Sequence, residues 1–165
     1  IAVHGLLLLG ATLGFIGLNW APARVFMGDV GSLFLGVSTL FVAMHGVTRG
    51  YTSPWFWLIV AGMFVADATT TLLKRLMRGD DVTSAHRSHL YQRLARRWGS
   101  HAKVTLVYFA LNVSWFLPLA LVARHFPEWG AGFAMLAYLP VIGVCLKLGA
   151  GEPDHPTGSN NNSKR

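Results

Sequence analysis

Residues 22–36 read PARVFMGDVGSLFLG and mark the point where a short polar segment becomes an apolar run that continues to Val47. Such a run approaches the roughly 20 apolar residues that a helix needs to cross about 30 Å of hydrocarbon. Four more stretches of this kind occur, at residues 1–18, 54–73, 104–123 and 131–148. With 53% hydrophobic and 13% charged residues, the composition excludes a soluble domain that must cover itself with a polar surface. We predict an all-α fold, a polytopic transmembrane helical bundle.

The two ends of the chain carry further expectations about domain organisation. The sequence opens with Ile inside an apolar run that has no basic flank, which is not the form of a signal peptide. We therefore expect the C-terminal part of a longer membrane protein. A membrane domain of about five helices should cover residues 1–148, with cytoplasmic loops at 19–29 and 74–103. The polar segment 149–165, rich in Gly, Pro and Asn, is typical of a disordered cytoplasmic tail.

The basic residues predict the orientation of the bundle. Eight of the 14 Lys and Arg residues lie between the third and fourth apolar stretches, and cytoplasmic loops hold such an excess. Alternation outward from that loop places four more on the same side and leaves only Arg49 and Arg124 on the other. This pattern predicts five spans with the N-terminal end outside and the C-terminal tail in the cytoplasm. Because the charges flank apolar spans, the net charge of +7 does not favour nucleic-acid binding.

Asp29 lies where the polar segment meets the second apolar stretch. The simplest explanation is a helix N-cap, which stabilises a helix by about 1 kcal/mol. The neighbouring glycines, Gly28 and Gly31, leave room for a ligand near the backbone. A helix start suits phosphate oxygens, and a carboxylate beside it suits Mg²⁺ that bridges to them. One carboxylate holds Mg²⁺ poorly without the substrate, so others must be near. Gly28, Ser32 and Gly36 also follow the four-residue spacing typical of close helix packing in membranes.

Asp67 lies inside the third apolar stretch, close to its predicted cytoplasmic end. An acid within a span costs about 3 kcal/mol on insertion scales, so its side chain should turn toward a polar cavity or partner. Thr70, Thr71 and Lys74 follow at i+3, i+4 and i+7 and extend one polar stripe along the helix. An interhelical hydrogen bond or a side chain that reaches the interface explains this residue about as well as a functional site does.

The basic loop contains TSAHRSHLYQRLARRWGSH at residues 83–101, which predicts an amphipathic surface helix capped by Thr83 or Ser84. One arc of this helix carries polar and basic residues: His86, His89, Arg93, Arg96 and Arg97. The opposite arc carries Leu90, Tyr91, Leu94 and Trp98 and should lie buried in the inner leaflet. A simple basic anchor explains the arginines but not two histidines at i and i+3. No third zinc ligand is evident, so we favour phosphate binding over metal ligation.

These motifs together resemble one family. NWAPARVFMGDVGSLFLG at 19–36, then Asp67, then AHRSHLYQRLARRWGSH at 85–101 are similar to the polyprenyl-phosphate N-acetylhexosamine-1-phosphate transferases, over roughly residues 1–148. That family includes phospho-N-acetylmuramoyl-pentapeptide transferase and the enzymes that start O-antigen, enterobacterial common antigen and teichoic acid synthesis. The resemblance implies transfer of a sugar 1-phosphate from a UDP-sugar to undecaprenyl phosphate at the cytoplasmic face, with release of UMP. Mg²⁺ is the implied cofactor, with Mn²⁺ as an alternative.

The resemblance also implies residue roles. Asp29 should ligate Mg²⁺, Asn19 and Phe26 should hold the uridine, and Ser32 should line the same pocket. His86 and His89 correspond to the His-rich cytoplasmic motif of the family. The implied catalytic residues are Asp29, His86, His89 and Asp67, and the implied substrate-binding residues are Asn19, Phe26, Ser32 and Arg93.

The chain departs from the family pattern in two places. The H-R-S-H arrangement followed by Tyr91 looks more like the O-antigen initiating branch than the branches with consecutive histidines. The paired-Asp motif of the family is absent, because Asp80 and Asp81 lie in the wrong loop. The fragment alone is therefore expected to be inactive.

The expected partners are a UDP-N-acetylhexosamine, undecaprenyl phosphate and membrane lipids, with a homodimer left open and no nucleic acid. Two other classes of function stay in view. A membrane transporter would also use an intramembrane Asp, although its site should lie nearer the membrane midplane. A non-catalytic membrane subunit explains the spans but gives no reason for FMGDVGS.

Overall fold

The computed structural model describes residues 2–20, 22–80 and 89–151, and this part of the chain is helical with no strand. In chain order the helices are α1 (Ala2–Asn19), α2 (Gly28–Thr48), α3 (Pro54–Val60), α4 (Gly62–Met77), α5 (Leu90–Trp98) and α6 (His101–Leu111), a π-helical turn η1 (Asn112–Phe116), α7 (Leu117–His125), a 3₁₀ turn η2 (Pro127–Trp129) and α8 (Gly130–Lys147). The predicted all-α class is confirmed.

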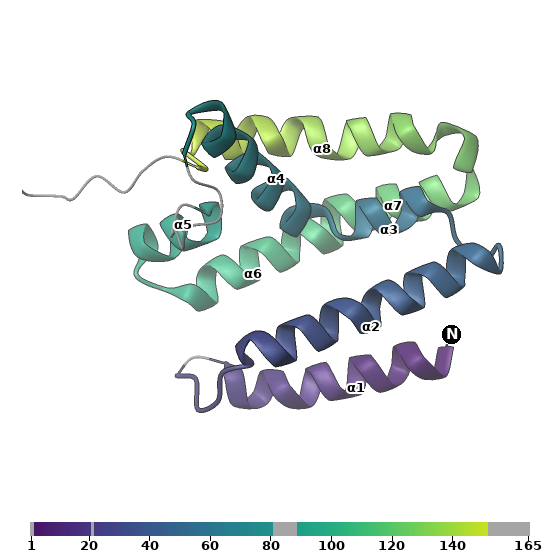
Figure 1. Ribbon diagram of the computed structural model, residues 1–165, viewed down its shortest axis with the longest axis horizontal. Coiled ribbons are helices and arrows are strands. Elements are labelled where there is room, and N and C mark those ends of the chain that lie inside the picture. Colours follow the sequence, from purple (N-terminus) through teal and green to yellow (C-terminus); the bar gives the residue numbers. More distant parts are fainter. Residues whose placement is uncertain (1, 21, 81–88, 152–165) are drawn as a thin grey trace, which may run out of the picture.

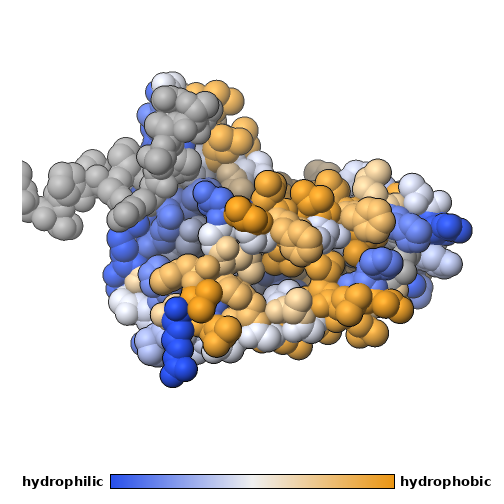
Figure 2. Space-filling model, turned by 60° about the horizontal axis from the view of Figure 1, so that its bottom comes forward, coloured by the Kyte–Doolittle hydropathy of each residue, from blue (hydrophilic) through white to orange (hydrophobic). Residues whose placement is uncertain are grey.

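Four helical segments are long and apolar enough to cross a membrane: Ala2–Asn19, Gly28–Thr48, His101–His125 and Pro127–Lys147. The bent pair α3 and α4 makes a fifth if it is taken as one span. Figure 2 shows hydrophobic residues over the middle of the visible face and hydrophilic residues toward its two ends. The fold is a polytopic transmembrane helical bundle, as predicted.

The ends of the helices are sorted between the two ends of the bundle (Figure 1). The α1–α2 connection, α5 and the C-terminal ends of α4 and α8 lie at one end. The α2–α3 and α7–α8 connections lie at the other. This is the arrangement that alternating spans require, and it places the loops predicted to be cytoplasmic together.

The third apolar stretch is not the single continuous helix that the sequence predicts. It breaks at Ala61, where α3 and α4 meet at 78°. A Cβ atom added to Gly62 would lie 2.3 Å from the ring of Phe116, so only glycine lets that ring reach the bend. The N–H of Met63, at the start of α4, donates to Asn112 Oδ1 at 3.3 Å. Tertiary packing and an amide from another span therefore replace the continuous helical ladder.

The core lies between α3, α4, η1, α7 and α8. Its buried members are Ile59, Met63, Phe116, Ala120, Ala123, Ala134 and Ala137. The hairpin of α1 and α2 lies beside this core (Figure 1) and buries only Val42 and Gly46. A Cβ added to Gly28 or Gly36 would meet no atom within 4 Å. The predicted small-residue face of α2 is thus open within the described chain.

The basic-loop helix begins later than the sequence predicts. Residues 81–88, which include His86 and the expected caps, lie outside the described residues. His89 precedes α5 in an extended conformation, with φ −64° and ψ 146°, so it does not share a helical arc with the arginines. Leu90 and Leu94 pack against Val104 and Cys145 rather than entering the leaflet. The expectation that the whole apolar arc lies in lipid is wrong for these two leucines, because α6 and α8 cover them.

The predicted tail begins inside the described part. Ala150 is fully buried, and the guanidinium of Arg78 donates to the carbonyl of Gly151. Residues 152–165 lie outside the described residues, so the disordered tail stays a prediction.

Candidate functional site

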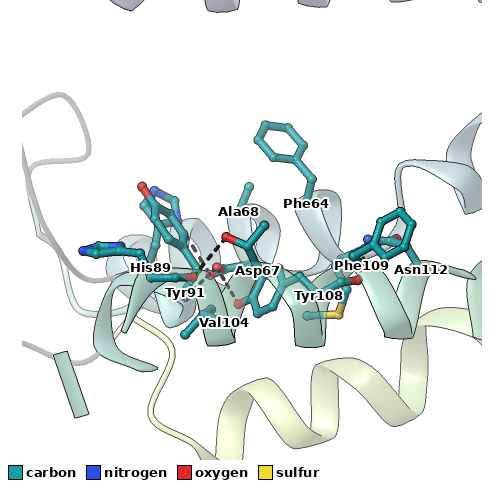
Figure 3. Close-up of a pocket in the computed structure, with 12 residues that line it drawn as sticks. Phe64, Asp67, Ala68, His89, Tyr91, Val104, Tyr108, Phe109 and Asn112 are labelled. Carbon is teal, nitrogen blue, oxygen red and sulfur yellow. Dashed lines mark hydrogen bonds and ion pairs between the residues drawn. The ribbon is translucent and has the colours of Figure 1, made fainter. Parts of the chain in front are cut away.

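Asp67 on α4 is the most highly connected polar residue of the candidate site, and it is only 3% exposed. Its Oδ1 accepts hydrogen bonds from the Leu90 N–H at 2.8 Å and the Thr71 hydroxyl at 3.2 Å. Its Oδ2 accepts from the Tyr91 N–H at 3.0 Å and the Tyr108 hydroxyl at 3.2 Å. Figure 3 shows this carboxylate at the meeting point of α4, α5 and α6.

The carboxylate of Asp67 caps α5 from another helix. The first N–H groups of a helix have no partner within it, and the side chain of His89 at the cap position accepts none of them. Asp67 supplies the missing acceptors, and its negative charge suits the positive end of the helix dipole. This explains why α5 begins at Leu90 and how a residue within a span fixes a surface helix.

His89 lies beside the carboxylate of Asp67. Its Nδ1 lies 3.6 Å from Asp67 Oδ1, which is too long for a hydrogen bond but close for an electrostatic contact. Its ring stacks on that of Tyr91 with centroids 6.0 Å apart. With 30% of its side chain exposed, the imidazole remains accessible to a ligand.

A cavity of about 550 Å³ opens between α4, α5 and α6 beside these residues (Figure 3). Its polar lining consists of Asp67, His89, Tyr91, His101, Thr105, Tyr108 and Asn112. Its apolar lining consists of Met63, Phe64, Ala68, Val104 and Phe109. In Figure 3 His89 and Tyr91 lie toward one end, whereas Phe64 and Phe109 lie toward the other. The cavity can therefore accept an amphiphile with a polar group near α5 and an apolar part along the span.

Five of the polar lining residues were not predicted to be site residues: Tyr91, which was expected on the apolar arc, and four residues of the span that follows α5. His101, Thr105, Tyr108 and Asn112 occur at i, i+4, i+7 and i+11, which places them on one face of an otherwise apolar helix. That spacing is a readable signal of a polar stripe. The Asn112 amide also donates to the Tyr108 carbonyl at 2.9 Å, so the stripe continues to the bend between α3 and α4.

Asp29 lies in the first turn of α2 and is exposed, so it is not the N-cap, which is Met27. Ser32 donates from its hydroxyl to the Asp29 carbonyl at 3.0 Å. Gly28 has φ +65°, a conformation that disfavours other residues, and it sets the entry of the chain into α2. The Asp29 carboxylate therefore lies at the start of a helix but does not cap it.

The predicted uridine-binding residues lie in or beside the α1–α2 connection. The Asn19 amide donates to the Val25 carbonyl at 2.8 Å and closes this loop. Phe26 is 80% exposed and follows directly. The loop thus displays an aromatic ring next to the start of α2.

The structure forms two groups from the predicted residues. Asn19, Phe26, Asp29 and Ser32 gather around the start of α2, and Asp67 and His89 meet at the cavity. The lining of the cavity does not include Asp29 or Arg93, and Arg93 lies one turn after His89 in α5. His86 lies outside the described residues.

The expected Mg²⁺ site can be compared with the side chains that could donate to a metal ion. Among the described residues, no group of three His, Cys, Asp or Glu side chains is placed to hold a metal ion. Asp29 offers one hard oxygen donor at a helix start, which fits the way Mg²⁺ is held by one or two carboxylates together with substrate phosphates. The residues therefore fit a substrate-dependent Mg²⁺ site rather than a preformed one.

Comparison with known proteins bears on the family of the chain. Residues 1–47 match the family described as glycosyl transferase family 4. The chain is 32% identical over 109 residues to a probable undecaprenyl-phosphate N-acetylglucosaminyl 1-phosphate transferase of Bacillus subtilis, covering 65% of this chain and 30% of that protein. It is 32% identical over 164 residues to the decaprenyl-phosphate N-acetylglucosaminephosphotransferase of Mycobacterium leprae, covering 89% of this chain and 40% of that protein. No solved structure matches the chain significantly.

A third relative represents another branch. The phospho-N-acetylmuramoyl-pentapeptide-transferase of Protochlamydia amoebophila is 44% identical over 75 residues, which cover 45% of this chain and 17% of that protein. The chain spans less than half the length of each of these relatives.

The helical membrane fold and these relatives agree with one class of protein, the membrane-embedded phosphoglycosyl transferases. The family model and these relatives support the family that the motifs predicted, the polyprenyl-phosphate N-acetylhexosamine-1-phosphate transferases of glycosyl transferase family 4.

Proposed function

We propose that the protein transfers an N-acetylhexosamine 1-phosphate from a UDP-sugar to undecaprenyl phosphate, as the first membrane step of O-antigen or another envelope polysaccharide. The observation that carries this proposal is the amphiphilic cavity, which pairs His89 and the Asp67-capped start of α5 with the apolar side chains of Met63, Phe64, Ala68, Val104 and Phe109. A polyprenyl phosphate has the same division into an anionic head and an apolar chain. The proposed location is the cytoplasmic face of the bacterial inner membrane.

The reaction joins two anions. An oxygen of the lipid phosphate attacks the phosphorus that carries the sugar, the bond from this phosphorus to the bridging oxygen breaks, and UMP leaves with that oxygen. Little covalent chemistry is required of the protein, so catalysis consists mainly of in-line positioning and charge neutralisation. His89 at the polar end of the cavity and Arg93 one turn further along α5 are suited to bind phosphate oxygens.

The start of α2 is proposed as the nucleotide side of the reaction. The exposed ring of Phe26 can stack on a uracil, and Asn19 shapes the loop that presents this ring. Ser32 lies one turn into the same helix and would line the pocket. Asp29 would hold Mg²⁺, which supplies charge neutralisation to the phosphates when it is bound.

The experiment is product identification. The full-length protein, reconstituted with undecaprenyl phosphate and Mg²⁺, is given UDP-N-acetylglucosamine, UDP-N-acetylfucosamine or UDP-N-acetylquinovosamine, and the lipid fraction is analysed by mass spectrometry. A lipid-linked pyrophosphoryl N-acetylhexosamine from at least one donor supports the proposal, and the preferred donor identifies the sugar. No such lipid from any UDP-N-acetylhexosamine, with the protein folded and inserted, would overturn it.

A further inference from the structure

A second cavity of about 490 Å³ lies between α5, α6, η1 and α8. Its lining shares only Met63 and Tyr108 with that of the first cavity. Among the described residues, none to which we assign a catalytic or substrate-binding role lines it. It is therefore a separate feature of the molecule.

The walls of this second cavity are almost entirely apolar. The lining includes Val107 and Leu111 of α6, Val144 of α8 and Leu148, which follows α8, and all four are exposed. The lining runs from Val107 to Trp115 along one helix and from Pro140 to Leu148 along the other, which is about 12 Å in each case at 1.5 Å per residue. The cavity is a groove of the length and character of part of an acyl chain.

Of the described residues that line the groove, one is charged: Arg97, in the last turn of α5. The neighbouring Trp98 also lines it and is 42% exposed. Trp and Arg at the end of an apolar groove are typical of the membrane–water interface, where the ring and the guanidinium meet lipid head groups. The positive charge lies at the end of the bundle where the basic residues gather, which is the predicted cytoplasmic end.

We propose that this groove binds an anionic phospholipid as a structural ligand, with its phosphate on Arg97 and one acyl chain between α6 and α8. Any lipid chain could cover the apolar walls, but Arg97 provides a charge that favours an anionic head group over a zwitterionic one. Leu90 and Leu94 of α5 also line the groove, so the bound chain would extend the contact that holds α5 on α6 and α8. The proposal depends on the membrane fold and not on the proposed reaction.

The test measures lipid binding without turnover. Full-length protein, delipidated in a neutral detergent, is titrated with phosphatidylglycerol or phosphatidylcholine and analysed by native mass spectrometry and thermal unfolding. Arg97→Gln removes the proposed phosphate partner. Arg96→Gln is the matched control, because it removes the same charge from the same helix but does not line the groove. Val144→Trp and, independently, Val107→Trp fill the groove from its two walls.

We expect wild type and Arg96→Gln to bind phosphatidylglycerol more tightly than phosphatidylcholine and to gain thermal stability from it. Arg97→Gln should bind phosphatidylglycerol about fivefold more weakly, the factor that corresponds to about 1 kcal/mol for one basic residue near an anionic surface. Each Trp variant that folds should lose the tight binding. Equal losses in Arg96→Gln and Arg97→Gln, no preference over phosphatidylcholine, or unchanged binding in both Trp variants would overturn the proposal. Displacement of phosphatidylglycerol by stoichiometric undecaprenyl phosphate would overturn it too, because the groove would then serve the substrate.

Discussion

At the scale of single residues, Asp67 shows how a buried carboxylate can serve structure and site together. Its two oxygens accept four hydrogen bonds from α4, α5 and α6, and this arrangement holds His89 at the edge of the cavity. The sequence left two explanations of Asp67 open, an interhelical hydrogen bond and a place in the wall of a polar cavity. The structure contains both. The role of Asp67 in turnover stays a prediction.

Asp67→Ala should destabilise the protein by about 3 kcal/mol, because it leaves the Leu90 and Tyr91 N–H groups and the Tyr108 hydroxyl without their acceptor. Asp67→Asn keeps one acceptor oxygen and should cost less. Thermal unfolding gives the order of stability, and hydrogen exchange should show faster exchange at Leu90 and Tyr91. If stability, exchange and activity all equal those of wild type, the cap has no energetic role.

His89→Ala should lower turnover by about 10²-fold, the lower range for loss of one positioned polar group at a phosphoryl-transfer or acid–base site. His86→Ala is expected to act in the same direction from the His-rich motif, although this residue lies outside the described part of the chain. Arg96→Lys preserves charge and should change turnover little. If the basic loop only attaches the protein to anionic lipid, the loss of an imidazole should not matter. Normal turnover in both His variants would therefore contradict a role in phosphate binding and support the anchor.

The sequence could single out Asp67 but could not decide its partners. Two of them are backbone N–H groups located 23 and 24 residues further along the chain, and no side-chain pattern marks a backbone donor. The start of α2 was easier to interpret, because Gly28, Asp29 and Ser32 are adjacent in sequence and stay adjacent in the structure.

At the scale of helices, hydrophobic length predicted where spans begin and end to within a few residues, since the bilayer fixes that length. It could not predict the bend between α3 and α4. No proline lies near Ala61, and the bend depends on the ring of Phe116 and the amide of Asn112, both from a span more than 40 residues away. The predicted start of α5 was wrong for a related reason, because the distant carboxylate of Asp67 takes the place of the expected local cap.

Gly62→Ala should destabilise the protein by about 2 kcal/mol, because the added methyl group overlaps the Phe116 ring and overpacked sites cost about 1–3 kcal/mol. Gly132→Ala on α8 is the control, since a Cβ there meets no atom within 4 Å. When Phe116 is first replaced by Leu, the added Gly62→Ala change should cost less stability than the same change costs in the wild type. Equal melting temperatures for Gly62→Ala and Gly132→Ala would show that the close approach does not hold the bend.

At the scale of the whole molecule, the sidedness predicted from the basic residues agrees with the positions of the helix ends. The loops predicted to be cytoplasmic lie at one end of the bundle, although they are far apart in the sequence (Figure 1). The start of α2 and the Asp67–His89 pair are both near this end, yet they form two separate groups in the described chain. The chain spans less than half of each relative described above, so the activity of the whole protein stays a proposal.

The orientation can be measured by labelling single cysteines in intact bacterial cells. Arg49→Cys and Glu128→Cys should react with an impermeant maleimide, because they lie in connections at the predicted outer end. Arg24→Cys and Lys147→Cys should react only after the cells are opened. The native Cys145 is buried and should contribute little background. Labelling of all four positions from outside, or the reverse pattern, would contradict the orientation given by the positive charges.

The central claim is that the start of α2 holds the metal-assisted phosphates of a sugar-1-phosphate transfer, and Asp29 tests it most directly. The measurement is UMP release from a UDP-N-acetylhexosamine by full-length wild type and Asp29→Asn, reconstituted with undecaprenyl phosphate and Mg²⁺ at equal membrane insertion. Asp29 is exposed and caps no helix, so the variant should fold as wild type does. The account predicts a loss of UMP release of at least about 10²-fold, because one ligand and several kcal/mol of charge stabilisation are removed. Substantial Mg²⁺-dependent release of UMP by folded Asp29→Asn would contradict it.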